Sequence, residues 1–159
     1  MPSPAPAHLP APVLQTLTMV ADALTGAEDP WWLIGGAAAG LQGIASPAIP
    51  DVDVVMSARD ARQVLPGLNI PPGEDGGTDL FRSEVFGRWT IPPLPVEIMG
   101  GFRIRTQGGW QPMEPASREA FLIDGRPVYA PSRSELIAIC RLFGRPKDLA
   151  RAEALSRLE

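Results

Sequence analysis

The chain has 159 residues, of which 45% are hydrophobic and 20% are charged, a composition typical of one globular domain with a real core. A single cysteine, Cys140, excludes an internal disulfide and a zinc cluster built on cysteines. The only histidine, His8, lies in a Pro/Ala-rich stretch, so the composition argues against catalysis by a Ser-His pair or by histidine-bound metal.

The net charge of −4 is unevenly distributed. Residues 1–81 contain two basic and nine acidic side chains, whereas residues 82–159 contain twelve basic and nine acidic ones. An acidic chain is a poor electrostatic match for long nucleic acid, which is bound largely through its phosphates. The basic second half could still supply cations to one small anionic ligand.

The N-terminus has no positively charged segment ahead of an apolar stretch, so the sequence predicts no secretory signal and a cytoplasmic protein. Residues 30–50 carry no charge, and their length could suggest a membrane helix. Their prolines and four glycines leave too few large apolar side chains to drive insertion, so we expect no membrane span.

The first third of the chain predicts a compact run of short elements. Residues 1–10 indicate a disordered Pro/Ala tail, and residues 11–159 a single domain. Apolar residues at helical spacing then predict an amphipathic helix that ends at Gly26. An apolar strand, Trp31–Ile34, is followed by a Gly-Gly turn and a small-residue helix over Ala37–Leu41.

A loop with Pro47 and Pro50 leads to a second strand, Asp51–Met56, which its apolar residues predict to be central. Ser57 is a plausible cap for a helix over Ala58–Leu65. The turn-forming residues of 66–79 predict a mobile loop at GEDGGTD.

The second half of the chain predicts several strands followed by two helices. Phe81–Thr90 predicts a strand, and Val96–Met99 another, which Gly100-Gly101 should turn into Phe102–Arg105. A hairpin is expected around Asp124-Gly125. Ser132-x-x-Glu135 predicts a capping box that opens a helix through Phe143, and a last helix should run over Pro146–Leu158.

Asp51 and Asp53 are candidate metal ligands. Because strand side chains alternate between faces, the two carboxylates point the same way, about 7 Å apart along the strand. Mg²⁺ typically takes one or two carboxylates together with substrate phosphate oxygens. The same alternation also occurs on an exposed strand face, so this motif alone leaves both interpretations open.

Glu97 is a third candidate, because Val96-Glu97-Ile98 places one carboxylate inside an otherwise apolar strand. A buried carboxylate without a partner is very unfavourable, so Glu97 should have a cation or a hydrogen-bond donor beside it. A salt bridge to an arginine is the structural alternative.

Residues 31–56 resemble the signature of the nucleotidyltransferase superfamily, the polymerase-beta-like fold that includes antibiotic nucleotidyltransferases and minimal nucleotidyltransferases. In that family a hydrophobic strand, Gly-Gly or Gly-Ser, a spacer and Asp-x-Asp follow one another. The C-terminal PSRSELIAICRLFGRPKDLARAEAL is similar to the helix, Arg-Pro-Lys-Asp and helix that end several small members. The resemblance covers roughly residues 12–158 and implies an α/β (α+β) fold, a mixed central sheet flanked by helices with a C-terminal helix pair.

The resemblance also implies roles for the site residues. Asp51, Asp53 and Glu97 would bind Mg²⁺, and Glu97 would help activate an acceptor hydroxyl. Gly35 and Gly36 would approach the phosphates of a nucleoside triphosphate such as ATP, although the family often has serine where Gly36 stands.

Lys147 is disfavoured in the first turn of a helix by the helix dipole, so it should have an anionic partner, either a ligand phosphate or a carboxylate. Asp148 suits the same turn structurally, and Arg145 and Arg82 are weaker phosphate-binding candidates.

The sequence leaves two functions open, beside the alternative of an ordinary α/β domain whose acidic residues have no role in a site. One is Mg²⁺-dependent transfer of a nucleoside monophosphate from a nucleoside triphosphate to a hydroxyl of a small molecule or a partner protein. The other is a weakly active or inactive nucleotidyltransferase-like regulatory module, such as the antitoxin-type half of a toxin–antitoxin pair.

Overall fold

The computed structural model describes residues 2–45, 49–75 and 77–158. The helices are α1 (Ala11–Ala23), α2 (Gly35–Leu41), α3 (Ala58–Gly67), α4 (Arg133–Phe143) and α5 (Pro146–Ser156). The strands are β1 (Ser3–Pro4), β2 (Trp32–Ile34), β3 (Val52–Met56), β4 (Gly73–Asp75), β5 (Phe81–Trp89), β6 (Val96–Thr106), β7 (Gly109–Pro112), β8 (Glu119–Ile123) and β9 (Arg126–Ala130). In the described residues we find no helix that has the length and apolar character needed to cross a membrane.

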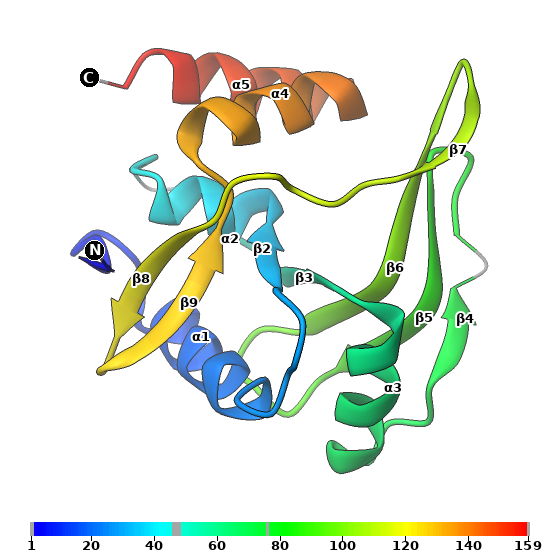
Figure 1. Ribbon diagram of the computed structural model, residues 1–159. Helices are drawn as coiled ribbons and strands as arrows, with labels where there is room; N and C mark the ends of the chain where they lie inside the picture. Colours follow the sequence, from blue (N-terminus) through cyan, green and yellow to red (C-terminus); the bar gives the residue numbers. More distant parts are fainter. Residues whose placement is uncertain (1, 46–48, 76, 159) are drawn as a thin grey trace.

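The larger sheet is mixed, as the sequence predicts. Its strand order is β2-β3-β6-β5-β4, with β7 paired to β6. The β3–β6 pair is parallel, and the other pairs are antiparallel. A smaller sheet of order β1-β8-β9 lies on the other side of β2 (Figure 1). The predicted central position of β3 is confirmed, since it lies between β2 and β6.

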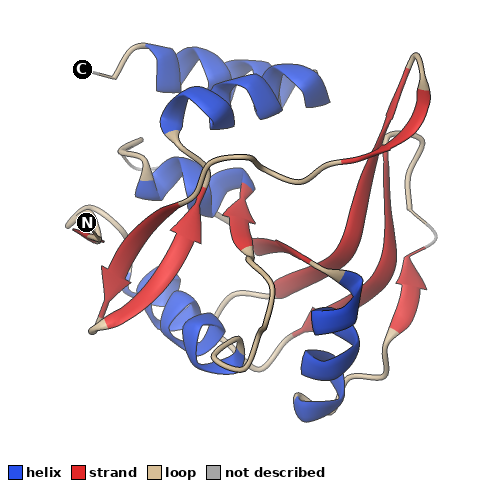
Figure 2. Cartoon of the chain, viewed as in Figure 1, coloured by secondary structure: helices blue, strands red, loops and turns tan. Residues whose placement is uncertain are grey.

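Helices flank the sheets, and α4 and α5 pack against each other as the predicted C-terminal pair (Figure 2). One hydrophobic cluster fills the space between β3 and helices α1, α2 and α3, and includes Leu17, Leu33, Val54 and Leu65. A second cluster lies on the opposite face of β3 and β6. It joins Val55 and Met99 to Ile139 and Phe143 of α4, among others. The residues that position the site belong to this second face.

The predicted turn at Gly100-Gly101 is wrong, because β6 continues through both glycines to Thr106. The glycines instead allow α3 to approach the strand. A Cβ built on Gly100 would lie only 2.6 Å from the Cβ of Ala61, so a side chain there would displace the helix.

Two other local predictions need correction. Gly73–Asp75 of the predicted mobile loop form β4, which pairs with β5. Ser132 caps α4 as predicted, but the reciprocal half of the capping box is absent, because the Glu135 carboxylate accepts from the N–H groups of Ala116 and Ser117, both at 2.7 Å.

The Pro/Ala segment has contacts that its composition does not reveal. Ser3–Pro4 pair with β8, and the side chain of Leu9 is only 4% exposed. Pro47, part of the predicted loop before β3, lies outside the described residues.

Candidate active site

Three carboxylates converge where β3 begins beside β6. Asp51 lies one residue before β3, Asp53 lies within it, and Glu97 occupies the second position of β6. Because β3 and β6 are parallel with Asp53 opposite Glu97, the two side chains point to the same face of the sheet. One oxygen from each of the three residues lies within 4.8 Å of the others. The structure thus brings together the three acids that the sequence singles out.

Asp53 has the most perturbed environment of the three. Its pKa is raised from an ordinary 3.8 to about 7, first by burial and then by the negative charges of Asp51 and Glu97. The positive charges of Lys147 and Arg151 oppose this rise. Like charges gathered in a partly buried site are expected to hold a proton or a cation at neutral pH.

Glu97 also has the arginine partner that the structural alternative predicts. Arg88, its cross-strand neighbour on β5, places Nη1 2.9 Å from Oε1 of Glu97. The Glu97 side chain is 27% exposed, so this ion pair lies at the edge of the site. Glu97 therefore belongs both to an ion pair and to the carboxylate cluster.

Gly35 contacts the acidic cluster directly. The predicted Gly-Gly turn is the first turn of α2, which begins at Gly35 with a φ of 67°. A Cβ on this residue would lie 2.8 Å from Oδ2 of Asp53. Gly35 is therefore required both by its backbone conformation and by its approach to the carboxylate. Gly36 follows in the same turn and lines the cavity that contains the three carboxylates.

Helix α5 supplies the positive charge of the site. Lys147, in its first turn, is exposed, and its positive charge lowers the pKa of Asp53. That it pairs directly with a phosphate or a carboxylate stays a prediction. Arg151 lies one turn later and also acts on Asp53, although sequence reasoning did not single it out. The i, i+4 spacing of Lys147 and Arg151 is the signal that could have found it.

Asp148 has the structural role that the sequence favours. Its side chain is 0% exposed, and Oδ1 accepts a hydrogen bond from Nη2 of Arg145 at 3.0 Å. Arg145 also covers the ring of Phe81, with 4.8 Å between the guanidinium carbon and the ring centre. Arg82 lies elsewhere, stacked on Trp110 of β7, so it is not brought to the carboxylates.

A cavity of about 540 Å³ contains this cluster. Its lining includes the three carboxylates and the two glycines. It also includes the cations Arg145, Lys147 and Arg151, and an apolar group from β5, β6 and α4. The residues of that apolar group are Phe81, Phe86, Met99, Phe102, Ile139 and Phe143. The cavity therefore joins an acidic floor to a basic edge and an apolar wall.

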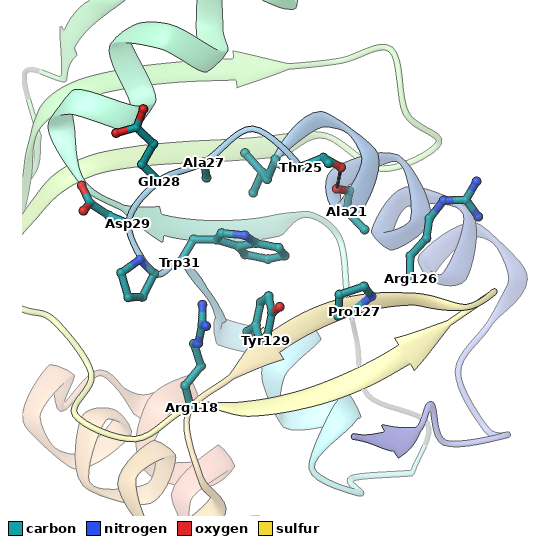
Figure 3. Close-up of a pocket in the computed structure, with 12 residues that line it drawn as sticks. Ala21, Thr25, Ala27, Glu28, Asp29, Trp31, Arg118, Arg126, Pro127 and Tyr129 are labelled. Atoms are coloured by element: carbon teal, nitrogen blue, oxygen red, sulfur yellow. Dashed lines mark hydrogen bonds between the residues drawn. The ribbon is translucent and has the colours of Figure 1, made fainter. Parts of the chain in front are cut away.

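A second cavity of about 370 Å³ lies between α1, the segment that follows it and β9. Figure 3 shows Trp31 and Tyr129 in this pocket, with Arg118 beside Tyr129. The guanidinium carbon of Arg118 lies 3.9 Å from the centre of the Tyr129 ring. None of Asp51, Asp53 and Glu97 lines this cavity, so it is separate from the acidic site.

Comparison with solved structures identifies the fold. A protein of Thermotoga maritima, provisionally described as a nucleotidyltransferase, is 22% identical, covers 95% of both chains and superposes with a TM-score of 0.74. The chain has the nucleotidyltransferase fold. The lincosamide antibiotic adenylyltransferase LnuA, solved with lincomycin, shares this fold at 14% identity and a TM-score of 0.58, over 91% of this chain and 96% of LnuA.

A further solved neighbour with the nucleotidyltransferase fold is ANT(2")-Ia in complex with adenylyl-2"-tobramycin. It is 15% identical, covers 89% of this chain and 86% of its own, and has a TM-score of 0.55. No family model matches the sequence, and no curated protein matches it. The predicted fold class is confirmed by these structures, and at such identities they establish the fold alone.

Proposed function

We propose that the protein is a Mg²⁺-dependent nucleotidyltransferase that moves a nucleoside monophosphate from a nucleoside triphosphate to a hydroxyl group. The observation that carries the proposal is the set of three carboxylates, from β3 and β6, with oxygens within 4.8 Å of one another. Lys147 and Arg151 of α5 act on the same cluster. Solved neighbours with this fold include a lincosamide antibiotic adenylyltransferase and a protein in complex with adenylyl-2"-tobramycin, which supports the same reaction class here.

The residues present fit a divalent cation. Carboxylate oxygens are the hard ligands that Mg²⁺ prefers, and their spacing allows all three to contribute to one site. Burial is the main cause of the raised pKa of Asp53, and the negative charges of Asp51 and Glu97 add to it; a cation would compensate those charges. A divalent cation bound there supplies charge neutralisation to the triphosphate and to the oxygens of an in-line displacement.

Residues of the chain would bind the triphosphate and accept the proton of the acceptor hydroxyl. Lys147 and Arg151 would pair with phosphate oxygens at the edge of the cavity, and Gly35 would leave room for the triphosphate beside Asp53. The acceptor oxygen would form a bond to the α-phosphorus while the bond from that phosphorus to the β-phosphate bridging oxygen breaks. Pyrophosphate would leave, and Glu97 would take the proton of the acceptor hydroxyl.

A binding or regulatory module remains the second candidate, because two features weaken catalysis. Gly36 offers no hydroxyl to the phosphates, and Glu97 shares its carboxylate with Arg88. Such a module would bind the nucleotide without turnover, or would not bind it at all. The acceptor in the enzymatic case is either a small molecule or a hydroxyl side chain of a partner protein.

Isothermal titration calorimetry with each nucleoside triphosphate, with and without Mg²⁺, tests the proposal. Binding should require Mg²⁺ in the wild type and should be lost in Asp53→Asn. Asp124→Asn is the matched control, because Asp124 lies in the β8–β9 turn, where asparagine tolerates the same positive φ. If no triphosphate binds the wild type at millimolar concentration, or if Asp53→Asn binds as the wild type does, the proposal is wrong.

A further inference from the structure

The apolar wall of the acidic cavity begins immediately beside Glu97. Glu97 and Met99 are two residues apart on β6, so their side chains share a face, about 7 Å apart along the strand. Phe86 of β5 is the cross-strand partner of Met99, just as Arg88 is the partner of Glu97. The apolar pair Met99–Phe86 is therefore the next cross-strand pair on the same face of the sheet after the ion pair Arg88–Glu97.

The aromatic side chains of this wall pack against one another. The ring centres of Phe81 and Phe143 lie 4.7 Å apart in an edge-to-face arrangement, and those of Phe81 and Phe102 lie 5.5 Å apart. Phe81 and Phe86 are only half-buried, so they still offer apolar surface to the cavity. A ligand that covers this surface would gain affinity by removing it from water.

The charges of the cavity disfavour a cationic occupant of the wall. Beyond Asp51, Asp53 and Glu97, Asp148 is the only acidic residue among the described lining residues. Asp148 is fully buried and neutralised by Arg145, with Arg151 at 3.7 Å. Arg145, Lys147 and Arg151 would repel a second cation, so ammonium groups on an acceptor would find no free carboxylate in the described lining.

We infer that the acceptor is a small hydroxyl compound whose body is apolar and uncharged where it adjoins the reacting hydroxyl. Its hydroxyl lies at Glu97, and its body rests on Met99 and Phe86. Met99 and Phe86 are then specificity-determining residues that select against polycationic acceptors. This inference rests on the proposed function, since it assigns the acceptor side of the same transfer.

Two matched fragments test the inference: cyclohexylmethanol (the alcohol) and piperidin-4-ylmethanol (the amine), which keeps the same hydroxymethyl group but carries a positive charge in the ring. Each is titrated into protein with ¹³C-methyl-labelled methionine, both alone and with a non-hydrolysable triphosphate analogue and Mg²⁺. The alcohol should shift the Met99 methyl resonance, and it should bind at least five-fold more tightly than the amine. The methyl group of Met19, on α1, serves as an internal reference that should not move.

Variants of the wall distinguish an acceptor bound there from a nucleotide base bound there. Met99→Gln and Phe86→Gln should each weaken binding of the alcohol at least five-fold, while Met19→Gln should not. Phe86 is half-buried, so its variant remains informative if Met99→Gln fails to fold. Affinity for the Mg²⁺–triphosphate analogue should stay within two-fold of wild type in every variant.

Three results would overturn the inference. The amine could bind as tightly as the alcohol, or neither fragment could shift the Met99 methyl group. The wall variants could also weaken the triphosphate analogue as much as the alcohol, which would place the nucleotide base on the wall. A wild type that binds fragments but no triphosphate would contradict the proposed function and leave the apolar preference of the cavity in place.

Discussion

Asp53 of β3 and Glu97 of β6 are directly opposite each other on neighbouring parallel strands. The backbones of such strands lie about 4.8 Å apart, so two carboxylates emerge side by side on one face. Asp51 approaches from the residue just before β3. Like charges held this close are unfavourable in the free protein, and a bound cation would relieve them.

The stability of the metal-free protein should fall as pH rises from about 4 to about 7. The folded state keeps a proton on Asp53, whose pKa is raised from 3.8 to about 7, whereas the unfolded chain releases that proton near pH 4. Asp53→Asn removes this dependence. Chemical denaturation in EDTA at pH 5 and pH 8 should therefore show a larger loss of stability in the wild type than in the variant.

Each pKa unit corresponds to about 1.4 kcal/mol, so this difference should amount to a few kcal/mol at most. Asp124→Asn is again the control, and its pH dependence should match that of the wild type. Equal pH dependence in the wild type and in Asp53→Asn would show that Asp53 is an ordinary carboxylate and that the cluster is less crowded than its geometry indicates.

Gly35→Ala should disrupt the acidic cluster specifically. Gly125 provides the matched control, because both glycines have positive φ angles, 67° and 77°, but a Cβ on Gly125 meets nothing within 4 Å. Both alanine variants should lose about 1–2 kcal/mol from backbone strain. Only Gly35→Ala also pushes against Asp53, so it alone should lose the rise in melting temperature that Mg²⁺ gives the wild type.

Thermal unfolding with and without Mg²⁺ measures both effects in one experiment. An intact Mg²⁺ response in Gly35→Ala would mean that the close approach of this residue to Asp53 has no part in metal binding.

Lys147→Met should weaken triphosphate binding about ten-fold, because it removes one positive charge at the edge of the site. The residue is exposed, so the free energy of unfolding should change by no more than about 0.5 kcal/mol. Lys147→Arg should restore much of the affinity, and Arg157→Met, at the far end of α5, should have no effect. Titration calorimetry in the presence of Mg²⁺ provides the measurement, and unchanged affinity in Lys147→Met would remove this residue from the site.

The sequence predicted those features that depend on local patterns. Asp51 and Asp53 are placed by strand alternation, Ser57 and Ser132 by capping preference, and Gly144 by its fitness for the left-handed end of a helix. Glu97 was identifiable because a lone carboxylate in an apolar strand needs a partner.

Features that depend on distant contacts were not predictable in this way. Gly100 looks like a turn residue, but it lies within β6, paired with Val85, and it must be glycine because Ala61 of α3 occupies the space that a side chain would fill. The Glu135 carboxylate bonds to the segment before β8, which a local capping pattern cannot anticipate. The pairing of Glu97 with Arg88, and the place of Arg151 beside Asp53, both required the register of the sheet and the packing of α5.

The reaction proposed for the acidic site transfers the α-phosphoryl group together with its nucleoside, and isotope labelling distinguishes it from transfer of the γ-phosphoryl group. Purified protein is incubated with Mg²⁺, a pool of hydroxyl compounds and a nucleoside triphosphate labelled at either the α- or the γ-phosphate. The α label should become attached to an acceptor while the γ label appears in pyrophosphate, and Asp53→Asn should abolish both. Transfer of the γ label to an acceptor, or no Mg²⁺-dependent turnover with any triphosphate, would contradict the proposed reaction.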